Sequence, residues 1–332
     1  MYKILIAGCG GMSNSWIEIT KDRTDCEIIG LVDFNINMAK EKNEKYQLNA
    51  RLYNSIMAAL EKEDPDLVFD ITVPETHSSV VMAALNAGCN VFGEKPMSDS
   101  LSNAEKMVEC AELSKKEYFV MQNRRYVPGI CALKDFLNSE QLGKIGQISS
   151  NFQLGPHFGG FRDEMDSPLI ADMAIHTFDA ARYITGKNAV SVYCHEYNPS
   201  WSWYKGNASA VCIFEMEDGS VFDYRGSWCA NGLNTSWESE WHISCAEGAV
   251  FWDGADKLHY EAAAESDGKA ALLKEIKPRA MKLVGHAACI DEMFNALTNG
   301  TRPQTDCRDN INSIRMVYKA IESARKNTKI ML

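Results

Sequence analysis

A lysine closes a short buried-strand pattern in the N-terminal half of the chain. Residues 88–96 read Gly-Cys-Asn-Val-Phe-Gly-Glu-Lys-Pro, so the apolar run ends in the charged corner Glu94-Lys95-Pro96. A lysine at the carboxyl end of a strand in an open α/β sheet points into the crevice where such sheets bind ligands. An isolated Lys-Pro is more often an exposed turn, so the rest of the chain must decide what Lys95 does.

A carboxylate and an imidazole share one face of a predicted helix in the C-terminal half. Asp172 and His176 stand at i and i+4, and Asp179 follows one turn later. A histidine can accept a hydroxyl proton near neutral pH, and a neighbouring carboxylate can orient it or raise its basicity. A polar stripe on a surface helix is the plainer alternative. The pair could also bind a metal, but no third ligand stands at metal spacing, so we expect none.

The elements that must hold these residues follow two patterns. In the N-terminal third, strand-like runs alternate with amphipathic segments, which is typical of a parallel sheet with crossover helices. Strands are predicted at 3–7, 27–32, 67–72, 90–92 and 118–122, and helices at 14–21, 37–46, 54–62, 76–86 and 101–115.

Beyond about Pro128 long strands dominate, with Asp218-Gly219 as a hairpin turn. We predict helices ending near 138 and spanning 169–184, strands at 145–154, 190–197, 208–217, 220–229 and 237–245, and closing helices at about 280–298 and 308–326. The fold class is therefore an α/β domain, residues 1–125, followed by an α+β domain with a mostly antiparallel open sheet, residues 126–332.

The first strand runs into a glycine-rich turn, Gly8-Cys9-Gly10-Gly11-Met12-Ser13. Gly8 would permit the tight turn, and Gly10 would let a pyrophosphate approach the positive end of the next helix. Gly11 and Met12 complete the predicted cofactor loop. Ser13 replaces the usual third glycine, and a plain glycine-rich turn is the alternative. With this loop, residues 1–125 are predicted to be a Rossmann NAD(P)-binding domain.

Asp33 ends the second predicted strand about 20 residues later, where a carboxylate can accept hydrogen bonds from the adenosine ribose. A carboxylate there repels a 2′-phosphate, and no Arg or Lys occurs in the next six residues. NAD is therefore favoured over NADP. The alternative is that Asp33 caps the following helix.

Two further segments carry polar groups at predicted strand ends. Val73, Pro74 and His77 lie where the cofactor ribose and nicotinamide would pass, although His77 could instead cap its helix. The donors of Asn123, Arg124, Arg125 and Tyr126 crowd the junction of the two predicted domains. Asn123 is predicted to contact the cofactor, and Arg124 and Tyr126 the substrate, while one of the two arginines could tether the domains.

Composition limits the function classes. The 332 residues have a net charge of −11 and no Lys/Arg cluster, so we expect no nucleic-acid partner. Eleven scattered cysteines without a Cys-x-x-Cys pair indicate reduced thiols, without disulfides or a structural zinc. No apolar stretch is long enough for a signal peptide or a membrane span, so a soluble, cytoplasmic protein without a membrane partner is expected.

The segment 155–163 precedes the predicted Asp172/His176 helix and is placed to cover a site there. Phe158 or Phe161 could stack on the ring of a ligand, and His157 or Arg162 could bind hydroxyl or carboxylate groups. A loop that closes the core is the alternative. The later cluster of Trp201, Trp203 and Tyr204 indicates core packing or subunit contact more than ligand stacking.

In this order and spacing, the motifs resemble those of the glucose-fructose oxidoreductase/inositol dehydrogenase (Gfo/Idh/MocA) family. The similarity runs along nearly the whole chain, from the Gly8 loop and Asp33 through His77, Glu94-Lys95-Pro96 and Arg125-Tyr126 to Asp172, His176 and Asp179, and ends in Gly300-Thr301-Arg302-Pro303 through Glu322-Ser323.

The resemblance implies a function as well as a fold. His176 would be the catalytic base and Asp172 the acid beside it. Lys95 would reach the nicotinamide ribose and the substrate hydroxyl, and Glu94 would lie at the cofactor. It further implies a cis bond before Pro96 and a homodimer or homotetramer formed through the open sheet. The reaction would interconvert a secondary alcohol and a ketone on a sugar, sugar derivative or cyclitol.

Two other function classes stay open. One is a glycoside-cleaving enzyme of the same fold that oxidises its sugar transiently and yields no net NADH. The other is a non-catalytic dinucleotide sensor, against which the joint presence of Lys95, Asp172 and His176 argues.

Overall fold

The computed structural model describes residues 1–263 and 272–332, which divide between two compact units. The first consists of residues 1–123 and 283–314, and the second of residues 124–282 and 315–332. The sequence places the domain boundary between residues 125 and 126 and assigns everything after it to the second domain. In the structure, a C-terminal stretch returns to the first unit.

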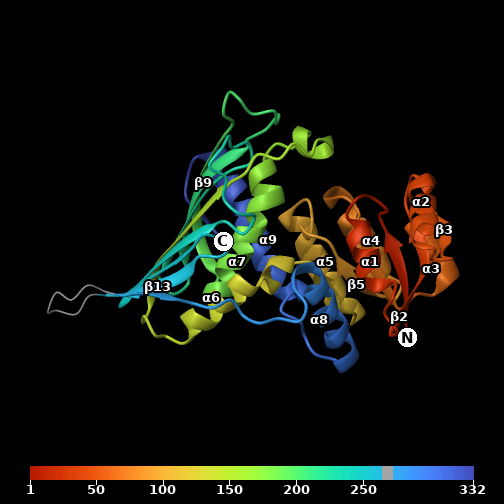
Figure 1. The fold of residues 1–332 in the computed structure, drawn as a ribbon. Coiled ribbons are helices and arrows are strands. Elements are labelled where there is room, and N and C mark those ends of the chain that lie inside the picture. Colours follow the sequence, from red (N-terminus) through yellow and green to blue (C-terminus); the bar gives the residue numbers. More distant parts are fainter. Residues whose placement is uncertain (264–271) are drawn as a thin grey trace. The chain divides into compact units, whose positions relative to one another are not determined.

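The first unit is a doubly wound α/β structure (Figure 1). Its six parallel strands follow the order β3-β2-β1-β4-β5-β6, which is that of a dinucleotide-binding sheet. The strands are β1 (Tyr2–Ala7), β2 (Cys26–Val32), β3 (Arg51–Tyr53), β4 (Leu67–Asp70), β5 (Asn90–Gly93) and β6 (Tyr118–Val120). The helices are α1 (Ser13–Thr20), α2 (Ile36–Tyr46), α3 (Ile56–Glu63), α4 (Pro74–Asn86), α5 (Leu101–Ser114) and α8 (Gly285–Asn299).

The register of this sheet aligns the ends of five strands. Ala7 pairs with Val32 on one side and with Asp70 on the other, Asp70 pairs with Gly93, and Gly93 pairs with Val120. Because all five strands run parallel, the residue that follows each of them lies at the same edge of the sheet. That edge carries the glycine-rich turn, Asp33 and the Glu94-Lys95 corner.

Aromatic rings fill the core beneath the sheet and explain why α8 belongs to this unit. Phe69 stacks on Phe92 with ring centroids 5.6 Å apart, and Phe92 stacks on Phe119 at 5.5 Å. Phe294 of α8 meets Phe92 edge-on at 5.3 Å. Each such pair adds about 0.5–1.5 kcal/mol beyond the area that it buries, so α8 is held to the sheet by its aromatic anchor.

The second unit contains a nine-stranded sheet in the order β14-β13-β12-β11-β7-β10-β9-β8-β15. All neighbours are antiparallel except β7 and β10, as predicted for a mostly antiparallel sheet. The strands are β7 (Ile145–Gln153), β8 (Ala189–Tyr197), β9 (Ser209–Met216), β10 (Val221–Ser227), β11 (Glu240–Cys245), β12 (Gly248–Trp252), β13 (Leu258–Ala262), β14 (Leu273–Glu275) and β15 (Ile330–Met331).

Helices cover one face of this sheet (Figure 1). They include α6 (Pro128–Asn138) and α7 (Ile175–Thr185), and α9 (Cys307–Lys326) ends in this unit. Phe178 of α7 packs edge-on against Phe214 and Tyr224 of the sheet, with ring centroids 4.8 and 5.2 Å away. This packing fixes the helix that carries His176. No helix in the described part of the chain is both long and apolar enough to cross a membrane.

The structure corrects several element predictions. The sequence missed β3 and the run β12 to β15, most of which are short. The single helix predicted at 169–184 begins with a π-helical turn, Leu169–Ala174, and becomes α-helical only at Ile175. π-helical turns are rare and occur frequently at functional sites. This turn carries Asp172 and ends just before His176.

Candidate active site

The glycine-rich turn between β1 and α1 has room for a dinucleotide. Gly8 has φ +92°, and a Cβ there would lie 2.4 Å from the carbonyl oxygen of Ile71, so only glycine fits. A Cβ at Gly10 or Gly11 would meet no protein atom within 4 Å, which leaves the space over both residues free for a ligand. Ser13 replaces the third glycine and donates a hydrogen bond from Oγ to the Gly10 carbonyl at 2.7 Å.

The first turn of α1 suits an anion. Met12 is the residue before the helix, and no side chain caps the helix start. The backbone N–H groups of Asn14 and Ser15 donate to the carbonyls of Gly11 and Met12 at 3.3 and 3.1 Å. The positive end of the helix dipole favours a phosphate at this turn. Met12 itself is 44% exposed. The predicted loop residues therefore lie at the uncapped start of α1.

A cavity of about 560 Å³ opens beside this turn. Its lining includes four predicted cofactor residues, Gly8, Gly10, Asp33 and Val73, together with Phe34 and Thr72. The sequence did not single out Phe34 and Thr72, and their only signal was their position just after strand ends. Concave, mostly apolar lining with a few polar groups is typical of a cofactor site.

Asp33 is fixed by two backbone donors at the edge of this cavity. Its Oδ2 accepts from the N–H of Cys9 at 2.8 Å, and its Oδ1 accepts from the N–H of Asn35 at 2.9 Å. Helix α2 is capped by Asn35, so the alternative that Asp33 caps this helix is wrong. Each carboxylate oxygen keeps acceptor capacity, because an ionised carboxylate offers about four lone-pair sites. A ribose diol fits that capacity.

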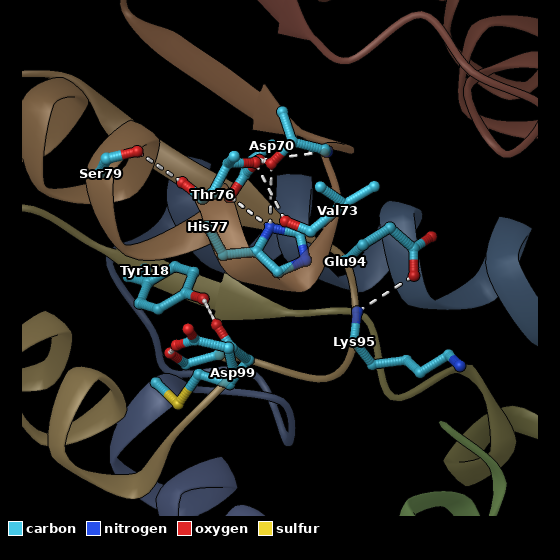
Figure 2. Close-up of polar contacts among 12 residues, drawn as sticks. Asp70, Val73, Thr76, His77, Ser79, Glu94, Lys95, Asp99 and Tyr118 are labelled. Atoms are coloured by element: carbon cyan, nitrogen blue, oxygen red, sulfur yellow. Dashed lines mark hydrogen bonds and ion pairs between the residues drawn. The ribbon is translucent and has the colours of Figure 1, made fainter. Parts of the chain in front are cut away.

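His77 forms a buried pair with Asp70 (Figure 2). Its Nδ1 lies 2.7 Å from Oδ2 of Asp70 and 3.3 Å from Oγ1 of Thr72, and the side chain is 1% exposed. No side chain caps α4, which starts with Pro74 after Val73, so the alternative that His77 caps this helix is wrong. Burial lowers the pKa of His77, but the charge and hydrogen bond of Asp70 outweigh it and raise the pKa above its usual value.

The Glu94-Lys95-Pro96 corner follows β5 at the same edge (Figure 2). The Lys95-Pro96 peptide bond is cis, as the family resemblance implies. Glu94 is buried and accepts a hydrogen bond from the backbone N–H of Lys95 through Oε2 at 3.1 Å. The side chain of Lys95 is half-buried. The carboxyl edge of one sheet thus brings together the glycine turn, the His77-Asp70 pair and this lysine.

The side chains of the 3₁₀ turn Asn123–Tyr126 contact different partners. In the first unit, Asn123 Nδ2 lies 3.4 Å from Nδ1 of His286. In the second unit, Arg124 pairs with Glu238, and Tyr126 is buried. Both arginines of this turn bind carboxylates of the second unit.

Arg125 holds Asp179 with a two-pronged, buried ion pair. Its Nε and Nη2 lie 2.7 and 2.6 Å from the two carboxylate oxygens, and Arg182 adds a contact at 3.8 Å. Removing one partner of such a pair typically costs about 3–5 kcal/mol, because it leaves a buried charge uncompensated. Asp179 therefore has a structural partner of its own, and its carboxylate is engaged away from solvent.

Asp172 has a different environment on the same helical stretch. Its Oδ2 accepts from Nε of Arg162 at 2.8 Å, and the side chain of Arg162 is 31% exposed, whereas that of Asp172 is 7% exposed. The Arg162 guanidinium also lies over the ring of Phe161, 4.7 Å from its centroid. His176, one turn after Asp172, is buried. The predicted covering segment therefore contacts the predicted acid.

His157 and the tryptophan cluster occupy the same unit. The His157 ring stacks on Trp203 with centroids 3.6 Å apart. Tyr204 is buried, whereas Trp201 is 61% exposed and donates from its indole to the Cys229 carbonyl at 3.1 Å. Within residues 1–263 and 272–332, no three His, Cys, Asp or Glu side chains are grouped as a metal site requires.

Comparison with known proteins agrees with this geometry. A family model described as "Oxidoreductase family, NAD-binding Rossmann fold" matches residues 2–122, and the model of the GFO/IDH/MocA C-terminal domain matches residues 130–251. The chain is thus an oxidoreductase with an NAD-binding Rossmann domain. It belongs to the Gfo/Idh/MocA family.

Proteins with named activities are similar to this chain. D-apiose dehydrogenase of Paraburkholderia graminis is 24% identical over 100% of this chain and 90% of its own length. Myo-inositol 2-dehydrogenase of Thermotoga maritima is 28% identical over 58% of this chain and 57% of its own length. An oxidoreductase from Agrobacterium radiobacter, solved with NAD⁺, L-tartaric acid and magnesium, shares the fold with a TM-score of 0.87 at 21% identity, covering 99% of this chain and 98% of its own.

The raised pKa of His77 predicts a pH-dependent contribution to stability. A histidine whose pKa is higher in the folded state stabilises the fold fully below its unfolded pKa of 6.5, and this contribution is lost as the pH rises through the folded-state pKa. We expect the thermal midpoint advantage of the wild type over the double variant Asp70→Asn/His77→Gln to shrink as the pH rises above about 6.5. Asp22→Asn, at an exposed ion pair, serves as the control. An advantage that stays constant or grows over this range would contradict the assignment.

Proposed function

We propose that the protein is an NAD(P)-dependent dehydrogenase that interconverts a secondary alcohol and a ketone on a sugar, sugar derivative or cyclitol. The observation that carries this proposal is the shared sheet edge, where the glycine turn, Asp33 and the Glu94-Lys95 corner follow paired strand positions. The glycine turn and Asp33 line a cavity of about 560 Å³. The dehydrogenase relatives that act on apiose and inositol support the substrate class.

The cofactor would be held by residues of the first unit. Gly8, Gly10, Gly11 and Met12 would receive the pyrophosphate, and Asp33 the adenosine ribose. The stretch from Val73 and Pro74 to His77, together with Glu94, Lys95 and Asn123, would line the path toward the nicotinamide. When bound, the cofactor supplies an acceptor for the hydride.

The proton and the substrate would be handled by Lys95, Asp172 and His176. In the oxidative direction, His176 takes the hydroxyl proton while the carbon loses a hydride and the C–O bond becomes C=O. Lys95 stabilises the developing alkoxide and orients the carbon. Asp172, held by Arg162, works beside His176. Arg124, Tyr126, His157 and Phe161 are the further substrate contacts that we propose.

The second unit would also mediate assembly. Tyr193, Val211 and Ile213 are each more than 40% exposed on paired strands of its sheet. An exposed apolar face of this kind favours a homodimer or homotetramer formed through the sheet. Light scattering on the full chain measures the mass directly, and a monomer at micromolar concentration would refute this assembly.

The catalytic assignment predicts the outcome of an absorbance assay. NADH formation would be followed with NAD and a panel of cyclitols, aldoses, uronic acids and glycosides. We expect turnover on at least one free polyol or sugar and a loss of at least about 100-fold in Lys95→Ala and His176→Ala, because each removes a group that acts in the transition state. Near wild-type turnover in both variants would refute the roles. If NAD binds but no NADH forms with any compound of the panel, and cleavage products of the glycosides appear, redox-neutral glycoside cleavage would be favoured.

The role of Asp33 predicts a change in cofactor preference. Asp33→Ala removes two ribose acceptors and the charge that repels a 2′-phosphate, so the NAD/NADP affinity ratio should fall about tenfold or more. Calorimetric titration with each cofactor measures both constants. Asp99→Ala, on the loop after Pro96, is a control that removes a carboxylate outside the cavity lining. An unchanged ratio would show that Asp33 only braces the loop through Cys9.

A further inference from the structure

A buried hydrogen bond links helix α1 to the lysine corner. The indole Nε1 of Trp16 donates to Oε1 of Glu94 at 2.7 Å, across 78 positions of sequence. Trp16 is fully buried and Glu94 is 6% exposed. A hydrogen bond to a buried carboxylate is stronger than one between neutral groups. The helix that begins at the glycine turn is therefore bonded directly to the residue before Lys95.

The second oxygen of Glu94 reaches Lys95 itself. Oε2 accepts from the backbone N–H of Lys95 at 3.1 Å, and the backbone N–H of Glu94 donates to the carbonyl of Asp70 at 2.8 Å. Glu94 thus serves two donors with two acceptor oxygens. Only a carboxylate offers both, since the amide of Gln carries one acceptor and one donor group.

The packing around Trp16 leaves its orientation little freedom. Its ring meets Phe69 edge-on with centroids 4.9 Å apart, and Phe69 belongs to the stacked aromatic core under β4 and β5. The aromatic core therefore fixes the direction of the indole N–H, and Glu94 is held where it accepts this hydrogen bond. One further hydrogen bond, from the backbone N–H of Lys95 to Glu94, fixes the position of the Lys95 backbone.

We propose that Trp16 and Glu94 are positioning residues for Lys95. The helix whose first turn would bind the cofactor pyrophosphate and the lysine that would orient the substrate carbon share one hydrogen-bonded anchor. This inference rests on the proposed function of Lys95. Its consequence is that loss of the anchor harms the chemical step much more than cofactor affinity.

The first test needs no substrate. Trp16→Phe keeps a ring against Phe69 but removes the N–H donor together with part of the bicyclic ring, and Glu94→Gln keeps the side-chain size and removes one acceptor. Hydrogen exchange, read by mass spectrometry on the full chain, should be about tenfold faster over residues 90–97 in both variants, the factor expected for one lost hydrogen bond. The NAD affinity of Trp16→Phe, measured by calorimetry, should change less than about threefold, because the Gly8 turn, Asp33 and Glu94 keep their side chains.

Trp252→Phe is the matched control. Its indole is also buried and donates one hydrogen bond, to the Ala255 carbonyl at 3.1 Å in the second unit. It should leave exchange at 90–97 and turnover unchanged. On a substrate found in the absorbance assay, Trp16→Phe and Glu94→Gln should lower kcat roughly 10- to 100-fold with little change in KM, as expected for a misplaced catalytic group.

The outcomes separate this inference from the proposed function. Wild-type exchange and kcat in both folded variants, with Lys95→Ala inactive, would overturn the anchor and leave the role of Lys95 intact. Wild-type turnover in Lys95→Ala would overturn the proposed function itself. A fall in NAD affinity as large as the fall in kcat would show a general structural role instead. If Trp16→Phe does not fold, Glu94→Gln decides alone.

Discussion

The parallel register of the first sheet is the constraint on which the cofactor half of the site depends. Val32, Ala7, Asp70 and Gly93 form one row across four strands, so the next residues of each strand meet at one edge. That row explains why Gly8 must lack a side chain, since a Cβ would strike the backbone after β4. A shift of one strand by a single residue would move Asp33 or Lys95 out of this edge.

Asp172 and Asp179 lie on one helical stretch of the second unit, but their ion-pair partners indicate different roles. Asp179 is enclosed by Arg125 and Arg182, and the exposed fraction of each of these side chains is small. Asp172 instead pairs with Arg162, which is partly open to solvent on a segment rich in aromatic residues. A fully enclosed pair suits a structural tie, whereas an accessible pair beside a histidine suits chemistry. Asp172 also lies in a π-helical turn, a feature that occurs frequently at functional sites.

Much of the fold follows from the sequence, because each long element of the first unit has a strong period and a clear turn. The glycine turn, Asp33 and the lysine corner were predictable since short motifs specify them. Strands such as β3 and β14 are three residues long, which is too short to show the alternating pattern that predicts a strand. The π-helical turn was not predictable, because its residues are equally compatible with an α-helix.

Contacts between distant residues escaped prediction for a different reason. Trp16 and Glu94, or Arg162 and Asp172, meet because strands and loops bring them together, and no local spacing records that meeting. The capping alternatives for Asp33 and His77 are wrong, because each side chain bonds to a neighbouring strand end or loop. Their positions after predicted strands identified both residues, but the side-chain partners depend on tertiary structure.

Isotope transfer tests most directly whether this protein moves hydride from a secondary alcohol to NAD. The full chain would be incubated with NAD and with cyclitols and sugars deuterated at their carbon-bound positions, and the reduced cofactor would be weighed by mass spectrometry. Direct transfer predicts a reduced cofactor about one mass unit heavier in the wild type and none in Lys95→Ala. Reduced cofactor without the label, or bound NAD and substrate with no reduced cofactor, would contradict the assignment.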